Sequence, residues 1–423
     1  MSIRWKLSKN SRGTMTSISL CMIVKNEEKY LPGCLESARP FVDEIIVVDT
    51  GSTDATKEIA ERYGAKVFHF PWNGNFSDAR NESLRHASSD WILYLDADER
   101  LLTGNEMRAL MPATAAIAYS VSIRSKHILP TGTVEQVNQY QRFFRRHPKI
   151  FFEGVVHEQV LPSLIRMNKS IESSELFIEH LGYGESLEKI NEKCLRNSEM
   201  LLRQLEKNPL DYYAHYQLGN TYGVMQRYDE AEVHLLKAVE HDRNVSIRGS
   251  SCNILVEIEM HRKDLDRAEQ WCRKSIKFVA LQVMGYWFLS GILAHKKQFE
   301  EAQQMLSFVR KNSSKPTGLA HDLAIAPGEY NYRSIVCHEG LANKAVAEGN
   351  TALAHAFVTK AEQEGIRSLK LQTIGIQTAM ALNEYDVAME RIDFMIRNLP
   401  EESFSQRERF MAIRKKIEAV CVA

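Results

Sequence analysis

Two aspartates separated by one small residue follow a strongly apolar run in this chain. Asp96 and Asp98 flank Ala97, and carboxylate oxygens at this spacing suit Mg²⁺ or Mn²⁺ carrying a diphosphate. A solvated acidic turn after a buried strand gives the same tripeptide without a metal. The D-x-D pattern is therefore a candidate metal and nucleotide site, and the adjacent Glu99 is interpreted as structural.

Polar residues also end two earlier apolar runs. Asn26 and Glu27 follow the first run, and both can accept hydrogen bonds from ribose hydroxyls or a base edge. The alternative is a helix entry, in which Asn26 caps the next helix and Glu27 favours its positive end. Asp49 closes the second run, and capping explains Ser52 to Asp54 but not Asp49 itself. An acid at the end of a buried strand favours a ligand-binding role.

Arg80 lies early in a polar segment for which Ser77 is the expected helix cap. A cation near the positive end of its own helix is unfavourable by about 0.3–1 kcal/mol. A bound diphosphate would offset this cost and gain a forked donor. A salt bridge from Arg80 to Asp78 or Glu82 explains the residue equally well.

The segment Phe151–Glu158 contains a glycine and then, beyond an expected short strand, an imidazole and a carboxylate side by side. His157 and Glu158 are adjacent, so in extended chain one faces the cleft while the other packs beneath it. His180 ends the last expected strand before the character of the chain changes. A lone histidine is usually structural, and a structural role is therefore the alternative for His157 and for His180.

The elements that position these residues follow from the alternation of apolar runs and polar, helix-like stretches. The runs are short and almost uninterrupted, as in strands covered on both faces of a parallel α/β sheet. The expected strands are Ile18–Val24, Glu44–Asp49, Lys66–Phe70 and Trp91–Asp96. The expected helices between them are Lys29–Ala38, Thr53–Tyr63 and Ser77–Ala87. Ligands collect beyond the carboxyl ends of such strands, so the polar strand ends should share one rim.

Beyond about residue 187 the pattern becomes helical and repeats. Alanines at 231, 268, 302, 354 and 388 are spaced by 37, 34, 52 and 34 residues, and the first copy has the L-G-x-x-Y spacing of a tetratricopeptide repeat. A generic helical bundle is the alternative. The 52-residue step predicts an inserted loop that includes Lys315–Gly318 and Ala326–Gly328. We expect a leader at 1–16, a catalytic domain at 17–185, a connecting helix at 186–208 and a repeat domain at 209–423.

Composition narrows the class of protein. The 423 residues carry 54 Lys and Arg and 54 Asp and Glu, and this zero net charge favours neither nucleic acid nor an anionic membrane as a partner. Seven cysteines without C-x-x-C spacing suggest reduced thiols. The polar, basic start has no signal-peptide core, and no apolar run is long enough to span a membrane. We therefore expect a cytoplasmic protein.

Residues 17 to about 185 resemble a family 2 glycosyltransferase of the type A fold. Five motifs in order carry this resemblance: Val24–Glu28, Asp49–Asp54, Phe76–Asn81, Asp96–Asp98 and Glu153–Glu158. The C-terminal tetratricopeptide-like repeats resemble those of bacterial transferases that modify proteins or peptides, such as bacteriocin S-glycosyltransferases and flagellin glycosyltransferases. The resemblance implies a mostly parallel nucleotide-sugar-binding sheet, a nucleotide-diphosphate sugar donor, Mg²⁺ or Mn²⁺, and inversion at the anomeric carbon.

Roles carried over from the resemblance divide the rim between donor and acceptor. The donor-binding positions are Val24, Asn26, Glu27, Asp49, Arg80, Asn81 and Asp96. Asp98 would ligate the metal directly, Asp96 would share metal and ribose, and His180 would complete the metal shell. Glu158 is the first candidate for the catalytic base and His157 the second, although the local pattern differs from that of the usual inverting-family base.

The main hypothesis is an inverting, metal-dependent glycosyltransferase that moves a sugar, from a UDP-sugar by preference, to Ser, Thr or Cys of a polypeptide held by the repeats. One alternative is a transferase that builds lipopolysaccharide or another glycan. Another is a non-catalytic scaffold with a degenerate transferase domain. Whether the repeats also join copies of the chain is left open, as are the sugar and the choice between Mg²⁺ and Mn²⁺.

Overall fold

The computed structural model describes residues 16–111, 116–129, 132–181, 187–313, 325, 327–400 and 403–422. The chain divides into two compact units, Met1–Arg243 and Asn244–Ala423. The expected leader, apart from Thr16, and the Lys315–Gly318 part of the expected insertion lie outside the described residues. Pro327 and Gly328, expected in the same loop, instead begin helix α13 (Pro327–Ala347).

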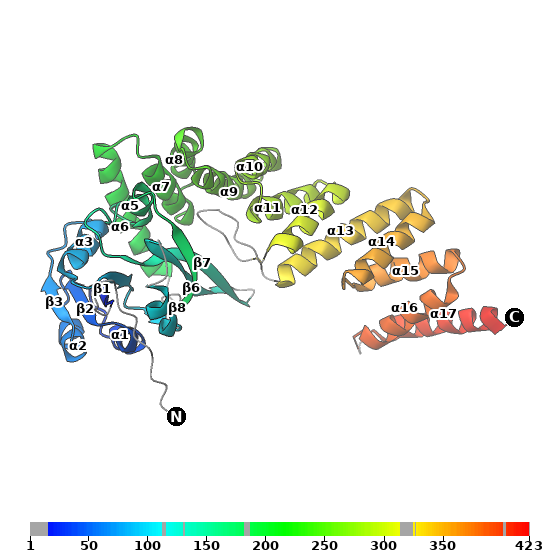
Figure 1. Ribbon diagram of the computed structural model, residues 1–423. Helices are drawn as coiled ribbons and strands as arrows, with labels where there is room; N and C mark the ends of the chain where they lie inside the picture. Colours follow the sequence, from blue (N-terminus) through cyan, green and yellow to red (C-terminus); the bar gives the residue numbers. More distant parts are fainter. Residues whose placement is uncertain are drawn as a thin grey trace, which may run out of the picture. The chain divides into compact units, whose positions relative to one another are not determined.

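The first unit is built on one mixed sheet of eight strands in the order β3-β2-β1-β4-β7-β6-β8-β5 (Figure 1). Its strands are β1 (Ile18–Val24), β2 (Glu44–Asp49), β3 (Lys66–His69), β4 (Trp91–Tyr94), β5 (Glu99–Leu101), β6 (Ala118–Leu129), β7 (Gly132–Arg145) and β8 (Ile171–His180). The first four are parallel to one another, as predicted. The long β6–β7 pair was not predicted; β7 joins β4 in the antiparallel direction.

Alternate residues of the central strands face different helices. Leu20 and Met22 of β1 pack in one cluster with Leu31 of α1 (Leu31–Ala38). Cys21 between them joins a second cluster, and its thiol contacts the carbonyl of Ser83 in α3 (Phe76–His86). Because successive side chains of a strand point to opposite faces, α1 and α3 cover opposite faces of the sheet. The strands are therefore buried on both sides, which explains their uninterrupted apolar sequence.

Among its described residues, two 3₁₀ turns and six further helices complete the first unit. They are the 3₁₀ turns η1 (Arg39–Phe41) and η2 (Gly104–Glu106), with the helices α2 (Thr56–Arg62), α4 (Met107–Leu110), α5 (Leu161–Arg166), α6 (Leu187–Lys207), α7 (Tyr212–Val224) and α8 (Tyr228–His241). The first compact unit thus extends through two helices beyond the predicted connecting helix at 186–208. The predicted domain boundaries remain a proposal.

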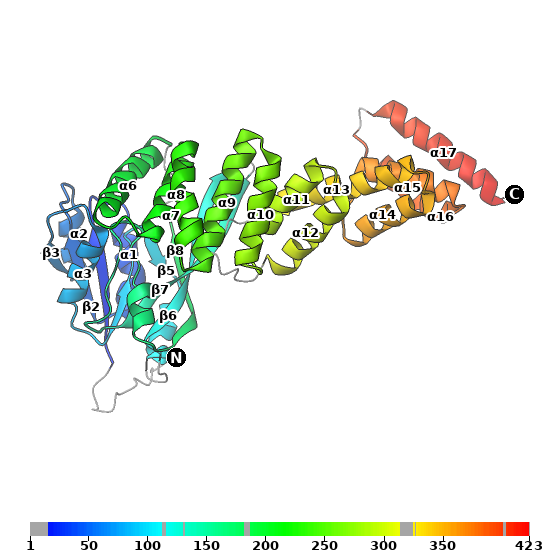
Figure 2. The same cartoon turned by 90° about the horizontal axis from the view of Figure 1, so that it is seen from above.

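The second unit consists of helices that follow one another as antiparallel pairs (Figure 2). They are α9 (Val245–Arg262), α10 (Leu265–Phe278), α11 (Met284–His295), α12 (Phe299–Asn312), α13, α14 (Thr351–Gln363), α15 (Leu369–Ala381), α16 (Tyr385–Asn398) and α17 (Phe404–Val422). The alanines that defined the repeat occupy the fourth position of α8, α10, α12, α14 and α16, and all are fully buried. A methyl group at this position lets the paired helices approach closely. The predicted α/β sheet domain followed by helical repeats is confirmed.

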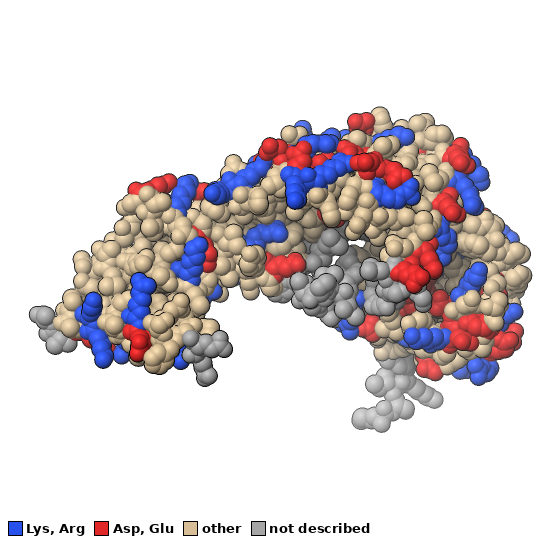
Figure 3. All heavy atoms as spheres, turned by 180° about the vertical axis from the view of Figure 1, so that it is seen from behind, with Lys and Arg blue, Asp and Glu red and all other residues tan. Residues whose placement is uncertain are grey.

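Charge is distributed without separation of sign on the face seen in Figure 3, where Lys and Arg side chains alternate with Asp and Glu. Within the second unit, Arg273 pairs with Glu269 and Glu301, and Lys296 also bonds Glu269. Positive and negative side chains thus balance locally, as they do over the whole sequence. Over the residues for which coordinates are described, no helix combines the length and apolar character that crossing a membrane requires.

Candidate active site

The loops after β1 and β2 are tied together at the rim of the sheet. The Ser52 hydroxyl accepts from the Asn26 amide nitrogen at 3.0 Å, and the Asn26 side-chain oxygen accepts from the Thr53 amide nitrogen at 2.8 Å. Asp54 and Glu28 form a second reciprocal pair with each other's loops. Asn26 adopts a left-handed conformation, with φ of 56°. It does not cap α1, whose N-cap is Tyr30; it joins the two loops.

Asp49 has partners within its own turn. It is 1% exposed, and its carboxylate accepts from the amide nitrogens of Ser52 at 3.0 Å and Gly51 at 3.2 Å. This turn explains an acid that capping of the following helix did not explain. Val24, also predicted at the donor site, is buried, and its carbonyl accepts from the amide nitrogen of Thr50 at 3.0 Å.

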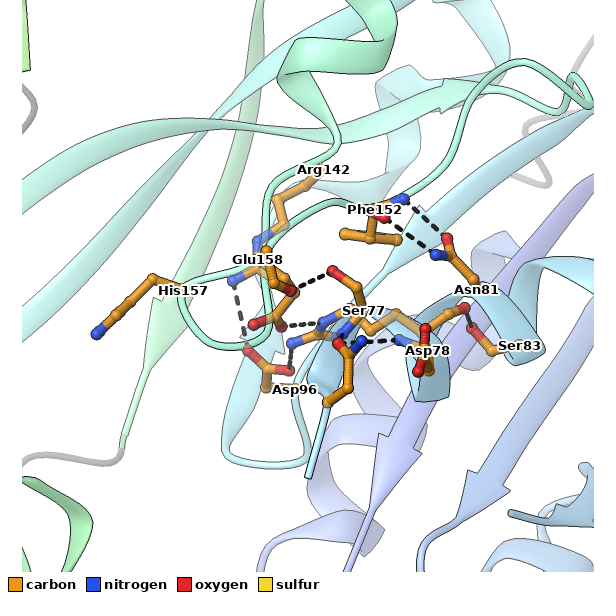
Figure 4. Close-up of polar contacts among 12 residues, drawn as sticks. Ser77, Asp78, Asn81, Ser83, Asp96, Arg142, Phe152, His157 and Glu158 are labelled. Carbon is orange, nitrogen blue, oxygen red and sulfur yellow. Dashed lines mark hydrogen bonds and ion pairs between the residues drawn. The ribbon is translucent and has the colours of Figure 1, made fainter. Parts of the chain in front are cut away.

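Asp96 begins the turn after β4 and lies between two guanidinium groups. Arg80 of α3 donates to its Oδ1 at 2.7 Å, and Arg142 of β7 approaches its Oδ2 at 3.5 Å (Figure 4). Arg142 also donates to Glu99 at 2.8 Å, and Glu99 accepts from the Asp96 amide nitrogen at 2.8 Å. The guanidinium of Arg142 lies over the ring of Tyr94, 4.2 Å from its centroid.

Burial and neighbouring charges shift the pKa values of three acids at the rim in different directions. Burial acts to raise the pKa of Asp96, but the neighbouring Arg80 and Arg142 outweigh it and hold that pKa below its usual range. Burial raises the pKa of Glu99 to about 7, with Arg142 opposing the increase and Asp96 adding to it. Burial, together with the negative charges of Asp98 and Asp96, also raises the pKa of Glu27 to about 7.

Asp98 and His180 meet across the pairing of β5 and β8. Glu99 of β5 is aligned with His180 of β8, so the residue before Glu99 reaches the imidazole: Asp98 Oδ2 lies 3.0 Å from His180 Nε2. Both side chains are about one-quarter exposed. Burial lowers the pKa of His180, but its hydrogen bond to Asp98 and the negative charges of Asp98, Glu99 and Asp96 together outweigh this effect and raise it.

The side chains at this rim could supply only part of the ligands of a divalent cation. The described residues contain no group of three or more His, Cys, Asp and Glu side chains arranged to hold a metal ion. Asp98 and His180 supply one carboxylate and one imidazole, a pair better suited to Mn²⁺ than to Mg²⁺. Asp96 faces Arg80 and Arg142 instead. Two protein ligands suffice where phosphate oxygens and water fill the remaining positions.

Glu158 lies inside the site, whereas His157 points out of it. Arg80 Nε donates to Glu158 Oε1 at 2.5 Å, so one guanidinium joins the carboxylates of Glu158 and Asp96. Figure 4 shows the His157 side chain directed away from this cluster. No regular strand precedes the pair; Glu153 and Gln159 form an isolated antiparallel bridge instead. His157 has a φ of 54°, a left-handed conformation that departs from the expected extended chain.

Local predictions around α3 need correction. Asn75, and not Ser77, caps this helix, accepting from the amide nitrogens of Ser77 and Asp78. The Ser77 hydroxyl instead donates to the Gly154 carbonyl at 2.5 Å. Asn81 was expected at the donor site, but its amide exchanges two hydrogen bonds with the backbone of Phe152, at 2.8 and 3.0 Å (Figure 4).

Sequence reasoning missed three residues that adjoin the site: Arg142, Gln204 of α6 and Tyr213 of α7. Arg142 stands in the run Gln141–Arg146, whose basic character was visible, but an arginine paired with a buried carboxylate looks the same in sequence as one facing solvent. Gln204 accepts from the amide nitrogen of Val155 at 3.1 Å. Tyr213 accepts from Gln159 Nε2 at 2.9 Å. Gln204 and Tyr213 lie about 50 positions from these partners, and no local sequence pattern indicates such contacts.

Comparison with known proteins identifies two families whose models match parts of this chain. The model of the family Glycosyl transferase family 2 matches residues 19–159, and that of the tetratricopeptide repeat matches residues 212–245. A TPR repeat-containing protein of Synechococcus elongatus is 37% identical over 48% of this chain and 52% of its own length. The SPbeta prophage-derived glycosyltransferase SunS of Bacillus subtilis is 28% identical over 57% of each chain. The chain thus spans about half the length of these curated relatives.

Among solved structures, glucosyl-3-phosphoglycerate synthase from Mycobacterium tuberculosis, in complex with phosphoglyceric acid, shares 26% identity. The match has a TM-score of 0.23 and covers 26% of this chain and 44% of that one. The same enzyme has been solved with Mn²⁺, uridine-diphosphate and glucosyl-3-phosphoglycerate. On the strength of the family models, the chain carries a glycosyl transferase family 2 domain at residues 19–159, joined to a tetratricopeptide repeat at residues 212–245.

Proposed function

We propose that this protein is an inverting, metal-dependent glycosyltransferase that moves a sugar from a UDP-sugar to a Ser, Thr or Cys side chain of a polypeptide. The observation that carries the proposal is a pair of charged clusters at one rim: Asp98 with His180 at 3.0 Å, and Glu158 joined through Arg80 to Asp96. The first cluster is suited to a metal–diphosphate, and in the second we assign Glu158 as the carboxylate that would meet the acceptor. The family 2 domain and the similarity to SunS support the reaction class.

Asp98 and His180 would hold the cation. When bound, it would neutralise the charge that develops on the leaving diphosphate. Arg80 and Arg142 keep the Asp96 carboxylate ionised and fix its direction, so that it can accept from ribose hydroxyls or metal-bound water. These side chains are oriented by the protein before the donor arrives, which lowers the reorganisation needed in the transition state.

Glu158 would receive the acceptor proton. The acceptor oxygen or sulfur attacks the anomeric carbon opposite the leaving group, the bond from that carbon to the diphosphate oxygen breaks, and the proton moves to the carboxylate. The ion pair with Arg80 orients the Glu158 carboxylate. A carboxylate can take a proton from a thiol, whose pKa is about 8.5, more readily than from an aliphatic hydroxyl.

Nucleotide release tests the enzyme assignment. The full-length protein is incubated with a panel of UDP- and other nucleotide sugars, with Mn²⁺ or with chelator, and free nucleotide is measured. We expect turnover that needs the metal and is lost in Asp98→Ala. Asp90→Asn is the matched control, because Asp90 precedes the same strand at its opposite end and bonds the amide nitrogen of Ser17. Absence of metal-dependent turnover with every donor would overturn the proposal.

The acceptor class is tested separately by intact-mass measurement. Candidate polypeptides with Cys, Ser or Thr are incubated with the active donor, and a mass increase of one sugar unit is expected. Transfer only to lipid-linked glycans would support the glycan-building alternative and would leave the assignment as a transferase intact. Because the similarity to SunS covers only about half of each chain, the polypeptide acceptor needs this direct measurement.

A further inference from the structure

The carboxylate of Glu158 is carried by a short closed loop, residues 153–159, here called the acceptor loop. Glu153 and Gln159 close it by two backbone hydrogen bonds of 3.0 Å each. Within it, Gly154 and His157 have φ angles of 98° and 54°. The second value is unfavourable for a residue with a side chain and persists only where the surroundings enforce it. The position of Glu158 therefore depends on what holds this loop.

One side of the acceptor loop is held by the sheet domain. The amide nitrogen of Phe76 donates to the Val155 carbonyl at 2.9 Å, and the Ser77 hydroxyl donates to the Gly154 carbonyl. Both contacts reach only the first half of the loop. Gln204 of α6 adds a third contact there, to the amide nitrogen of Val155. The second half, which contains His157 and Glu158, has a different support.

That support comes from the first helix of the tetratricopeptide repeat. The Tyr213 hydroxyl accepts from Gln159 Nε2 at 2.9 Å and from Gln217 Nε2 at 2.7 Å, and it donates to the His157 carbonyl at 3.5 Å. A phenol has one proton to donate, and the carbonyl can only accept, so the direction of each bond is fixed. Burial raises the pKa of Tyr213 to about 12, so the proton that reaches His157 stays in place at neutral pH.

We infer that Tyr213 is a positioning residue for the transfer step: its hydroxyl holds the acceptor loop on both sides of Glu158, so that the carboxylate faces Arg80. The inference rests on the proposed role of Glu158 in transfer. Tyr213 itself lies in the segment matched by the tetratricopeptide repeat model. The first repeat helix therefore completes the acceptor side of the site, in addition to any part the repeats play in holding a polypeptide.

The test removes one oxygen from the full-length protein. Tyr213→Phe keeps the ring and loses all three hydrogen bonds. Misplacing a reacting group by about 1 Å costs about 100-fold in rate, so kcat for sugar transfer should fall about 10- to 100-fold while KM for the nucleotide sugar stays within about twofold. Tyr212→Phe is the matched control, since it removes the same oxygen from the neighbouring tyrosine and keeps the ring contact with His241, whose centroid lies 5.2 Å from that of Tyr212.

A double-mutant cycle separates positioning from general loss of structure. Gln159→Ala removes one partner of the same hydroxyl, so the effects of Tyr213→Phe and Gln159→Ala on kcat should be strongly non-additive. Wild-type kcat in Tyr213→Phe would overturn the inference. A rise in KM for the donor as large as the fall in kcat, together with a lowered melting temperature, would also overturn the inference. That result would indicate a purely structural role of Tyr213.

Hydrogen exchange tests the loop independently of catalysis. Backbone amides of residues 153–159 should exchange faster in Tyr213→Phe than in wild type or Tyr212→Phe. Unchanged exchange there would overturn the inference even in an active enzyme. Faster exchange in a protein that shows no turnover with any donor would support the holding of the loop and would locate the failure in the proposed function.

Discussion

At pH 9, where Glu99 is ionised, removing Arg142 is expected to destabilise the first unit severely, because it leaves a carboxylate buried without a counter-charge. The guanidinium of Arg142 lies 2.8 Å from Glu99, and the two side chains are only 11% and 2% exposed. Breaking a buried ion pair by removing one partner costs about 3–5 kcal/mol. The lost contact with the face of Tyr94, 4.2 Å from the ring centroid, adds about 0.5–2 kcal/mol. Arg142→Met should therefore lose about 3.5–7 kcal/mol at this pH.

The loss is large compared with the stability of an ordinary domain, about 5–15 kcal/mol. Urea unfolding followed by near-UV circular dichroism measures it, because Trp91 packs on Phe143 within the same unit, with ring centroids 4.7 Å apart. Arg85→Met is the control. Arg85 pairs with Glu82 but is 73% exposed, and such a pair contributes at most about 1 kcal/mol.

A compensating change identifies the cause. Glu99→Gln removes the charge but keeps an oxygen that can accept from the Asp96 amide nitrogen. The double variant Arg142→Met/Glu99→Gln should recover most of the stability lost in Arg142→Met. A loss below about 1 kcal/mol in the single variant, or the absence of any recovery in the double variant, would refute the assignment of Glu99 and Arg142 as a mutually dependent buried pair.

Three further predictions concern the acceptor loop and the first helix pair. Glu158→Gln should lower kcat for transfer by at least about 100-fold. His157→Gly should retain most activity, because the imidazole points away from the cluster and glycine accepts the φ of 54°. Loss of activity only in the His157 variant would reverse the two roles. His215 and His234 share a hydrogen bond of 2.7 Å between their Nδ1 atoms, and burial together with His215 lowers the pKa of His234 from 6.5 to about 4. Stability from this neutral pair is present above pH 6.5 and lost as the pH falls through 4, so the melting temperature should fall less over that interval in His234→Gln than in wild type; equal falls would contradict the assignment. Gly219→Ala should destabilise the helix pair by about 1–3 kcal/mol in urea unfolding, because a Cβ would lie 2.6 Å from a leucine of α8; helix propensity alone predicts a gain of about 1 kcal/mol.

The rim of the sheet was predictable because it depends on local signals. An apolar run that stops at a polar residue marks the end of a buried strand, and parallel strands bring such ends to one edge. The charges of Asp98 and Asp96 accordingly help to raise the pKa of Glu27. The repeat was predictable for a similar reason, since the buried alanines recur at the period of a helix pair.

Contacts between distant segments were beyond this reasoning. Arg80 was expected to bind a diphosphate or a neighbour on its own helix, yet its partners are Asp96 and Glu158, the latter 78 positions away. Asn81 has the composition of a ligand-binding residue, but its amide is bonded to the backbone of Phe152. Nothing in the sequence around His157 indicates a left-handed residue, because that conformation is imposed by contacts from other elements.

The tied loops after β1 and β2 have a thermodynamic consequence for nucleotide binding. Fixing the backbone of one loop residue costs about 1–2 kcal/mol in conformational entropy. Reciprocal hydrogen bonds through Asn26 and Glu28 order both loops when the protein folds, so binding does not have to order them again. The nucleotide should therefore bind with a small heat-capacity change, governed by the surface it covers and not by coupled folding of the loops.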